Sequence, residues 1–327
     1  MKHLVIGATG QLGANLVRAL LERGMHVRAM MRPSSKTLVL DGLAVERVVG
    51  DLNDPDSLVR ACDGVQVVYH AAGYYPTATI PAEHAKAQAL RETRNVLQAV
   101  RTASVDRFVF ASSLTTIGLS PPGTLATEAY PFSTKFRHNP YLIAKAAMED
   151  EVLAAAQHDV PAVVIVPTAF FGPYDSKPTS GTQILMIAKR QMPAYIQGPV
   201  NVIDVRDVAE AMVRAAERGR IGERYIVGHW NTTQKDLNAL IAKVVGVAPP
   251  LIPIPFAMAR LGARVGEWAF RTILRKPAPI PAFFVEVLRH MQHYDCSKAI
   301  RELDYPRHSV EQAIRDAVEW FRAHGYL

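Results

Sequence analysis

The chain has 327 residues, of which 49% are hydrophobic, and its 37 basic and 30 acidic residues give a formal net charge of +7. This composition is typical of a globular protein large enough for one lobed domain or two modest domains. The basic residues are scattered rather than gathered in a block, so the charge favours anionic small ligands, and nucleic acid is not expected as a partner.

The two cysteines, Cys62 and Cys296, cannot form a disulfide framework and lack zinc-ligand spacing, which favours a reducing, cytoplasmic location. His290 and His293 have the spacing of a metal pair, but no third ligand is evident, so no metal site is expected. The N-terminus lacks the apolar core of a signal peptide, and the most apolar stretches, residues 162–171 and 251–270, are too short or contain arginines. We therefore expect no membrane span and no membrane partner.

The first element is a short apolar strand that ends in three glycines, Gly7, Gly10 and Gly13, and continues as an amphipathic helix through Leu16 and Leu20. This spacing is typical of a dinucleotide-binding turn, in which the glycines make a tight turn, let the backbone reach a pyrophosphate and let the helix pack on the strand. A β-carbon at Gly10 would stand where phosphate should lie. An ordinary strand-to-helix turn is the alternative, but the position directly after the first strand favours the nucleotide site.

The second strand, His26 to Met31, ends at Arg32, where an acidic residue would bond the ribose 2′-hydroxyl of NAD. A guanidinium followed by Ser34, Ser35 and Lys36 suits a 2′-phosphate instead. Hydrogen bonds to charged groups contribute about 1.5–3 kcal/mol each, so NADP(H) is expected to bind roughly tenfold to a hundredfold more tightly than NAD(H). The alternative is a solvated arginine at a strand end.

Further strands are expected at residues 46–49, 65–70, 107–111 and 162–166, separated mostly by helical segments. This alternation predicts an α/β fold with a Rossmann-type doubly wound parallel sheet. Composition changes after Gly172 and Pro173, and an extended stretch at residues 249–255 precedes another helix. Because the segment from Val200 to Arg218 returns to strand and helix, we predict a discontinuous division: residues 1–171 and 200–228 bind NADP, and residues 172–199 and 229–327 form a smaller C-terminal substrate lobe.

A catalytic set is suggested by a strand that ends in Ser112 and Ser113 and by a helix that carries Tyr141 and Lys145 on one face. The ordinary pKa of tyrosine is about 10, and a nearby ammonium favours the phenolate and brings the pKa toward neutral pH. In a reduction, Ser113 would hold the substrate oxygen and Tyr141 would give it a proton while a nicotinamide supplies hydride. Tyr294 and Lys298 share the spacing but follow no hydroxyl-bearing strand end, so we interpret them as a coincidence.

Several further motifs accompany this set: Gly50-Asp51-Leu52, His70-Ala-Ala-Gly73, Pro167 with Phe171-Gly172-Pro173, and Asp207-Val-Ala. Together with the glycine turn, Ser113, Tyr141 and Lys145, they resemble an extended short-chain dehydrogenase/reductase of the NAD(P)-dependent epimerase/dehydratase superfamily. The branch most similar holds dihydroflavonol reductase-like proteins and hopanoid-associated sugar epimerases. The resemblance covers essentially the whole chain.

The resemblance implies that Asp51 and Leu52 lie at the adenine, residues 71–73 lie along the cofactor, and Pro167 and Thr168 lie near the nicotinamide. It also implies a homodimer formed through residues 82–101 and 141–157. The expected cofactor-binding residues are Gly7, Thr9, Gly10, Gln11, Leu12, Gly13, Arg32, Ser35, Asp51, Leu52, Ala71, Ala72, Gly73, Ala111, Tyr141, Lys145, Pro167 and Thr168.

The chain departs from the family pattern at Ala89 and Glu92, where Asn and Gly are usual. Its strand from Val164 to Pro167 is apolar, whereas nucleotide-sugar enzymes tend to carry a polar Arg-x-x-Asn there, and this favours a fairly apolar substrate.

On the substrate side we expect Ser113 and Phe170, with Tyr74 and Tyr75 as an aromatic wall or as loop packing. Three classes of function remain. The first is an NADP(H)-dependent reductase or dehydrogenase that acts on a small, fairly apolar ketone, aldehyde or secondary alcohol. The second is a nucleoside-diphosphate-sugar epimerase or dehydratase, and the third is a non-catalytic NADP-binding regulator. The presence of Ser113, Tyr141 and Lys145 favours an enzyme, and Arg32 favours the reductase.

Overall fold

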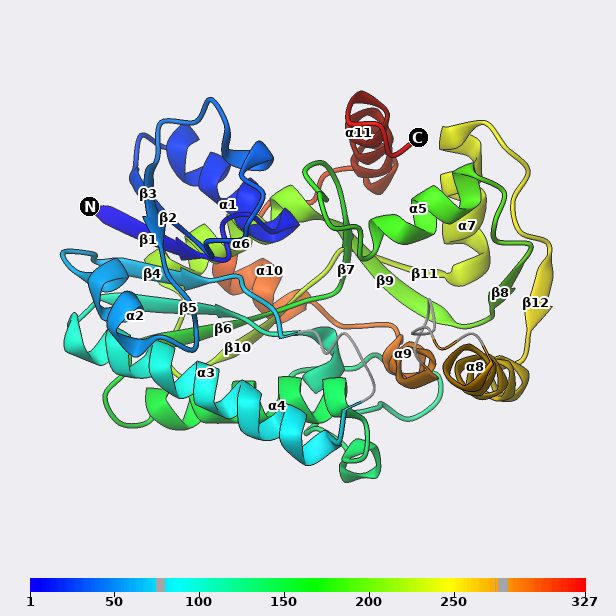
Figure 1. The fold of residues 1–327 in the computed structure, drawn as a ribbon, viewed down its shortest axis with the longest axis horizontal. Coiled ribbons are helices and arrows are strands. Elements are labelled where there is room, and N and C mark those ends of the chain that lie inside the picture. The colour runs from blue at the N-terminus through cyan, green and yellow to red at the C-terminus, as the bar shows by residue number, and fades with distance from the viewer. Residues whose placement is uncertain (75–79, 274, 276–281) are drawn as a thin grey trace.

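The computed structural model describes residues 1–74, 80–273, 275 and 282–327, without the side chains of residues 271 and 282–284. In this part of the chain the largest sheet has seven parallel strands in the order β10-β6-β5-β4-β1-β2-β3, with helices on both faces (Figure 1). Its strands are β1 (Lys2–Ile6), β2 (His26–Met31), β3 (Glu46–Val49), β4 (Val67–His70), β5 (Arg107–Ala111), β6 (Ala162–Pro167) and β10 (Arg224–Val227). The predicted Rossmann-type α/β fold is confirmed.

Side chains of the central strands alternate between two hydrophobic cores, because neighbouring residues of a strand point to opposite faces. In β1, Val5 packs into the core with α1 (Gln11–Glu22) and α6 (Val205–Arg218). Leu4 and Ile6 pack into the core with α2 (Pro55–Cys62), α3 (Ala82–Thr102) and α4 (Pro140–Ala156). Burial on both faces explains why these strands are continuous apolar runs in the sequence.

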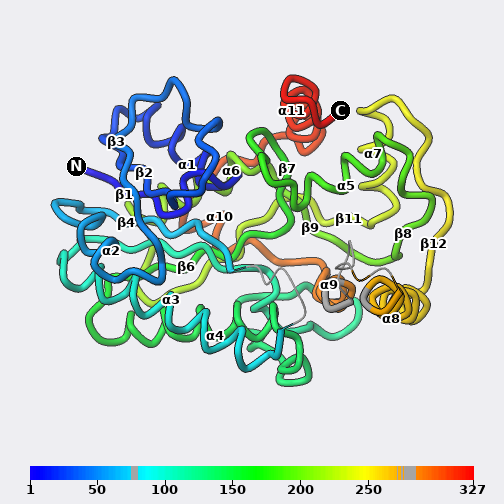
Figure 2. Tube along the Cα trace, in the orientation of Figure 1, coloured from blue at the N-terminus to red at the C-terminus, as the bar shows by residue number. Residues whose placement is uncertain are grey.

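A smaller lobe is built around two further sheets. Strand β9 pairs in parallel with β7 and antiparallel with β11, and β8 pairs in parallel with β12. The elements of this part are β7 (Ala169–Phe171), α5 (Gly181–Ala188), β8 (Ala194–Ile196), β9 (Pro199–Asp204), β11 (Trp230–Thr233), α7 (Gln234–Val245), β12 (Ile252–Ile254), α8 (Phe256–Thr272) and α9 (Ala282–Val287). Figure 2 shows β8, β12, α7 and α8 at the end of the molecule away from β1, β2 and β3.

The chain leaves the large sheet after β6 and returns to it with α6 and β10. Residues 169–171 and 200–204, which we assigned to the first domain from the sequence, form β7 and β9 of the small sheet. Strand β9 is buried almost throughout, like the strands of the large sheet, so its composition does not reveal which sheet it joins.

The C-terminal segment returns to pack on both parts. Helix α10 (Ser297–Leu303) packs against β10 and α6, and α11 (Val310–Ala323) packs against α7 and β9. The apolar stripe expected on the last helix is buried there, including Ile314 and Phe321. Among the described residues, no helix combines the length and the apolar character needed to cross a bilayer.

Candidate active site

A cavity of about 670 Å³ opens where β1, β4, β5 and β6 end. The carboxyl ends of parallel strands are the usual ligand site of open α/β sheets. The predicted residues that line this cavity are Gly7, Thr9, Gly10, Gln11, Leu12, Arg32, Ser35, Asp51, Leu52, Ala71, Ala72, Gly73, Tyr74, Ala111, Lys145, Pro167 and Phe170. Gly13, Ser113, Tyr141 and Thr168 are not part of this lining, and Tyr75 lies outside the described residues.

The glycine turn leaves room in front of the N-terminus of α1. Gly7 has a φ of +84°, and a β-carbon there would lie 2.7 Å from the Ala72 backbone nitrogen. At Gly13 a β-carbon would lie 2.2 Å from the Gly7 carbonyl oxygen, so glycine is needed for α1 to pack on the turn. At Gly10 the nearest atom is the Gly7 oxygen at 3.4 Å, an ordinary contact. The space beside Gly10 is therefore open to a ligand.

A buried polar atom also points to a ligand in this cavity. The Gln11 side chain donates through Nε2 to the Gly172 carbonyl at 2.8 Å, whereas its buried Oε1 has no hydrogen-bond partner among the described residues. An unsatisfied buried acceptor costs about 1–3 kcal/mol, so a donor from a bound molecule would be favourable here. The open helix N-terminus and this acceptor fit a dinucleotide with its phosphates at α1.

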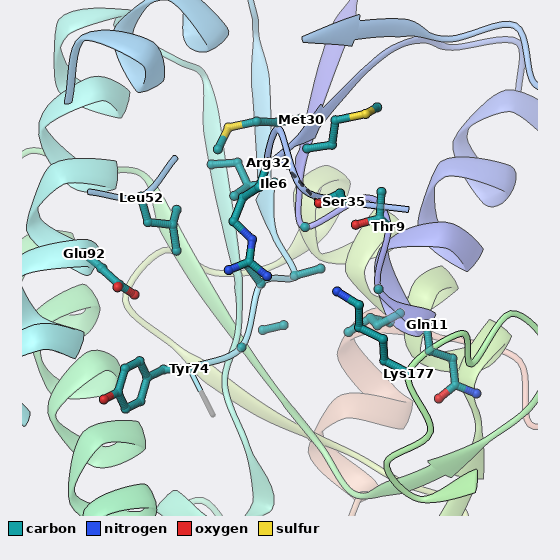
Figure 3. Close-up of a pocket in the computed structure, with 18 of the residues that line it drawn as sticks. Ile6, Thr9, Gln11, Met30, Arg32, Ser35, Leu52, Tyr74, Glu92 and Lys177 are labelled. Atoms are coloured by element: carbon teal, nitrogen blue, oxygen red, sulfur yellow. Dashed lines mark hydrogen bonds between the residues drawn. The ribbon is translucent and has the colours of Figure 1, made fainter. Parts of the chain in front are cut away.

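Arg32 reaches into the cavity from the end of β2 (Figure 3). A tight turn follows it: the Arg32 nitrogen donates to Ser35 Oγ at 3.2 Å, and the Ser35 nitrogen donates to the Arg32 carbonyl at 3.0 Å. The turn fixes the Ser35 hydroxyl beside the arginine at the cavity edge. A guanidinium with a neighbouring hydroxyl is an arrangement that binds phosphate well.

Lys177 faces Arg32 from the opposite wall and was missed in the sequence (Figure 3). It belongs to the loop between β7 and α5, which also contributes Asp175 and Thr179 to the lining. Asp175 is buried and accepts from the backbone nitrogens of Thr179 and Gly181 at 3.3 and 3.2 Å. Burial raises the pKa of Asp175 to about 6. The loop thus combines an exposed cation, Lys177, with a buried, hydrogen-bonded carboxyl group, Asp175, at the cavity.

A second polar group missed in the sequence lies on α3. The buried Glu92 carboxylate lines the cavity and accepts from Gln88 Nε2 at 3.0 Å and from Asn53 Nδ2 at 3.2 Å, while Tyr74 donates to Gln88 at 3.4 Å. Glu92 was noted only as a departure from the family pattern. The structure places Glu92 on the side of the cavity opposite Lys177 (Figure 3).

Tyr141 and Lys145 lie one turn apart at the start of α4. The Asn139 side chain caps this helix, accepting from the backbone nitrogens of Tyr141 and Leu142 at 3.1 Å each. Both side chains are buried, and Lys145 lines the cavity. Burial lowers the pKa of Lys145 to about 8, although the nearby Glu149 carboxylate acts in the opposite direction. A lysine with a pKa of about 8, close to neutral pH, thus lies one helical turn from a buried tyrosine.

The two serines after β5 have different partners. Ser112 lines the cavity, but its hydroxyl donates to the buried Glu149, which also accepts from Thr116 at 2.7 Å and pairs with Arg224 at 2.7 Å. Ser113 Oγ accepts from the nitrogen and the hydroxyl of Thr115, at 3.3 and 2.9 Å. The Ser112 hydroxyl thus donates to the carboxylate of the buried Glu149–Arg224 ion pair, whereas the Ser113 hydroxyl accepts in both of its contacts.

The second tyrosine–lysine pair has structural partners. Tyr294 is buried and donates to the carbonyl of His290 at 2.8 Å, and Lys298 pairs with Glu223 at 2.7 Å. The His290 ring packs against Phe136, and His293 bonds the Thr232 carbonyl. No group of three metal-ligating side chains occurs in the part of the chain that the structure describes.

The parallel sheet, the glycine turn and the cavity at the strand ends define a nucleotide-binding α/β protein. Residues 3–228 match the model of the NAD dependent epimerase/dehydratase family, and the chain belongs to this family of NAD(P)-dependent enzymes.

Relatives of known name extend over the whole chain. A Synechocystis sp. protein named "Putative dihydroflavonol 4-reductase" is 38% identical over 99% of this chain and 95% of its own length. Sterol demethylase protein B of Methylococcus capsulatus is 33% identical over 100% of both chains. Among solved structures, a nucleoside-diphosphate-sugar epimerase from Pseudomonas aeruginosa superposes with a TM-score of 0.85 at 29% identity, covering 100% of this chain and 99% of its own. The names include both a reductase and an epimerase.

Proposed function

We propose that the protein is an NADP(H)-dependent carbonyl reductase or alcohol dehydrogenase whose catalytic residues are Ser113, Tyr141 and Lys145. The observation that carries the proposal is Lys145, whose buried side chain lines the cavity at the glycine turn, one helical turn from Tyr141. A buried ammonium with a lowered pKa at the wall of a nucleotide cavity, one helical turn from a tyrosine, is an arrangement suited to proton transfer near neutral pH.

In the reductive direction, a bound nicotinamide would supply the hydride that the carbonyl carbon needs. Tyr141 gives a proton to the carbonyl oxygen, Lys145 favours the phenolate that remains, and Ser113 holds the oxygen by a hydrogen bond. Oxidation of an alcohol follows the reverse path, with Tyr141 accepting the proton.

Preference for NADP(H) is proposed from Arg32 and Ser35, which lie at the cavity edge where β2 ends. Lys177 supplies a further cation from the facing wall, suited to a phosphate of either nucleotide. The arginine pairs with a phosphate through a planar fork, whereas the lysine acts as a point charge. Only the Arg32 contact is therefore expected to distinguish the two nucleotides.

A fairly apolar substrate is proposed from the surroundings of Tyr141. This residue packs in a cluster with Phe136, Leu142 and Val287, and Phe170 lines the cavity. Strand β6 is buried throughout and ends in Pro167. The dihydroflavonol and the sterol in the names of the relatives are ring systems with large apolar faces, which such walls would accept.

The direct test is Tyr141→Phe, which removes only the proton donor. We expect turnover to fall by a factor of about 100 or more while NADPH affinity stays within about twofold. Steady-state nicotinamide absorbance and a fluorescence titration with NADPH measure the two quantities.

Tyr294→Phe is the matched control, because it changes the other tyrosine with the same spacing and should leave turnover nearly unchanged. Substantial residual activity of Tyr141→Phe would exclude Tyr141 as the proton donor.

A nucleoside-diphosphate-sugar epimerase is the second candidate, favoured by the structural similarity to the Pseudomonas aeruginosa enzyme. In that case the cofactor takes and returns hydride within one turnover. Product analysis with nucleoside-diphosphate sugars would show an isomer without net NADPH consumption. A cytoplasmic location and a homodimer through α3 and α4 remain proposals alongside either function.

A further inference from the structure

Helix α8 presents an apolar stripe to solvent. Met258, Leu261, Val265 and Trp268 recur at intervals of three and four residues, so they lie on one side of the helix. Their exposed fractions are 64%, 65%, 56% and 62%. Four large apolar side chains exposed in one row are far more than the isolated exposed residues of an ordinary surface.

The exposed apolar surface continues into the strand before the helix. Leu251, just before β12, and Ile252, its first residue, are 77% and 59% exposed, and Ile273, just after α8, is 68% exposed. β12 leads into α8 through Pro255, and both elements lie at the end of the molecule away from β1, β2 and β3 (Figure 1). The apolar surface therefore occupies one end of the smaller lobe.

The charges around this surface are predominantly basic. Among the side chains that the structure describes in residues 246–294, four are arginines (Arg260, Arg264, Arg275 and Arg289) and two are glutamates (Glu267 and Glu286). Arg264 and Arg275 are exposed beside the apolar stripe. Glu286 is turned inward, with a side chain that is only 14% exposed and that faces Arg260, His138 and Asn139. An apolar stripe bordered by arginines complements an apolar interior beneath anionic head groups.

We infer that α8 and the start of β12 dock the protein onto the surface of an anionic lipid bilayer. An amphipathic helix with an exposed tryptophan and basic flanks binds in the plane of the interface, with its apolar side chains below the head groups and its arginines at them. A second copy docked through the same surface would bring two predominantly basic borders together, which disfavours self-association through this face. The expectation of no membrane partner rested on the absence of a span and did not consider a helix lying on the surface.

The docking helix is connected to the candidate active site. Glu286 of α9 accepts from Asn139 Nδ2 at 3.3 Å and lies 3.9 Å from Arg260 of α8, and Asn139 caps α4, the helix that carries Tyr141. Val287 of α9 packs in the same cluster as Tyr141. If the proposed function holds, an apolar substrate would reach Tyr141 from the side of the protein that faces the bilayer.

The test is flotation of the full-length protein with vesicles of phosphatidylcholine alone and of phosphatidylcholine with phosphatidylglycerol. We expect binding to the anionic vesicles that weakens with salt, a blue shift of tryptophan fluorescence that Trp268→Phe removes, and a loss of about tenfold or more in binding for the double variant Leu261→Asp, Val265→Asp. Ile221→Asp is the matched control, because Ile221 is 49% exposed between α6 and β10, and it should bind like the unchanged protein.

Three results would overturn the inference. The unchanged protein could fail to float with either vesicle, or the double variant could float as well as the unchanged protein. The double variant could also bind vesicles normally and differ from the unchanged protein only in its oligomeric mass. The last would make this face a protein interface. Circular dichroism establishes that the variant is folded. Reduction of a water-soluble ketone tests the catalytic proposal separately, because neither Leu261 nor Val265 belongs to the catalytic or cofactor site.

Discussion

The nucleotide-binding sheet and the lobe that carries α8 differ in where their apolar side chains go. In β1, Val5 and Ile6 face opposite cores and are at most 1% exposed, whereas in α8 the side chains of Leu261 and Trp268 are mostly in solvent. Contacts within the chain therefore explain why the sheet has apolar side chains at these positions. In the second region the described residues leave apolar surface exposed, and this difference separates a cofactor scaffold from the surface that we propose meets a bilayer.

The largest expected effect comes from adding bulk inside the scaffold. Gly13→Val should destabilise the fold by about 3 kcal/mol, because the new side chain would collide with the Gly7 carbonyl. Gly262 in α8 is the matched control: a β-carbon there meets nothing within 4 Å, so Gly262→Ala should stabilise the protein by about 0.5–1 kcal/mol. Chemical denaturation measures both values, and similar effects at the two sites would contradict the comparison.

The next effect concerns which nucleotide the scaffold binds. Arg32→Ala should weaken NADPH binding by a factor of about 10 to 100 and leave NADH binding nearly unchanged, because only NADPH carries the 2′-phosphate. Lys177→Ala should weaken both to a similar and smaller extent. Titration calorimetry with each nucleotide measures these affinities, with Lys235→Ala, an exposed lysine outside the cavity lining, as the control. Equal losses for Arg32→Ala would remove the basis for an NADP preference.

A smaller effect is expected from pH, through the buried Lys145. Burial lowers the pKa of Lys145 to about 8, so its ammonium is lost as the pH rises through 8. The kcat/KM for reduction should fall up to about tenfold per pH unit above that point.

The free energy of unfolding should change with pH in the opposite direction. Between about pH 8 and the ordinary lysine pKa of 10.5, the unfolded chain binds the proton and the folded chain does not, so this residue contributes more stability as the pH rises. Lys145→Met should remove that rise. A flat activity profile from pH 7 to about 10 would show that the Lys145 charge is not needed.

The parts of the molecule that the sequence predicted best are those with strict periodicity and two buried faces. The strand from Arg107 to Ala111 is observed with the expected bounds, and the helix with Tyr141 and Lys145 begins at Pro140, as its cap at Asn139 requires. Most of the residues expected at the cofactor line the cavity, because their positions follow from the ends of such strands.

The remaining features depend on long-range contacts that no local pattern encodes. Lys177 lies in an irregular loop after Pro173, and Glu92 resembles any charged residue on a helix until α3 is placed beside Asn53. The sheet that β9 joins depends on its neighbours β7 and β11, which are distant in sequence. An apolar stripe such as that of α8 predicts burial, and its exposure is known only once the other described elements of the lobe have been placed.

The measurement that tests the central claim most directly is nicotinamide absorbance over time for the purified protein with NADPH or NADH and a series of apolar ketones, with nucleoside-diphosphate sugars examined separately by product analysis. The account predicts steady oxidation of NADPH, faster than that of NADH, with the matching alcohol as product. An unchanged absorbance with every ketone, together with a sugar isomer among the products, would contradict it and identify the protein as an epimerase.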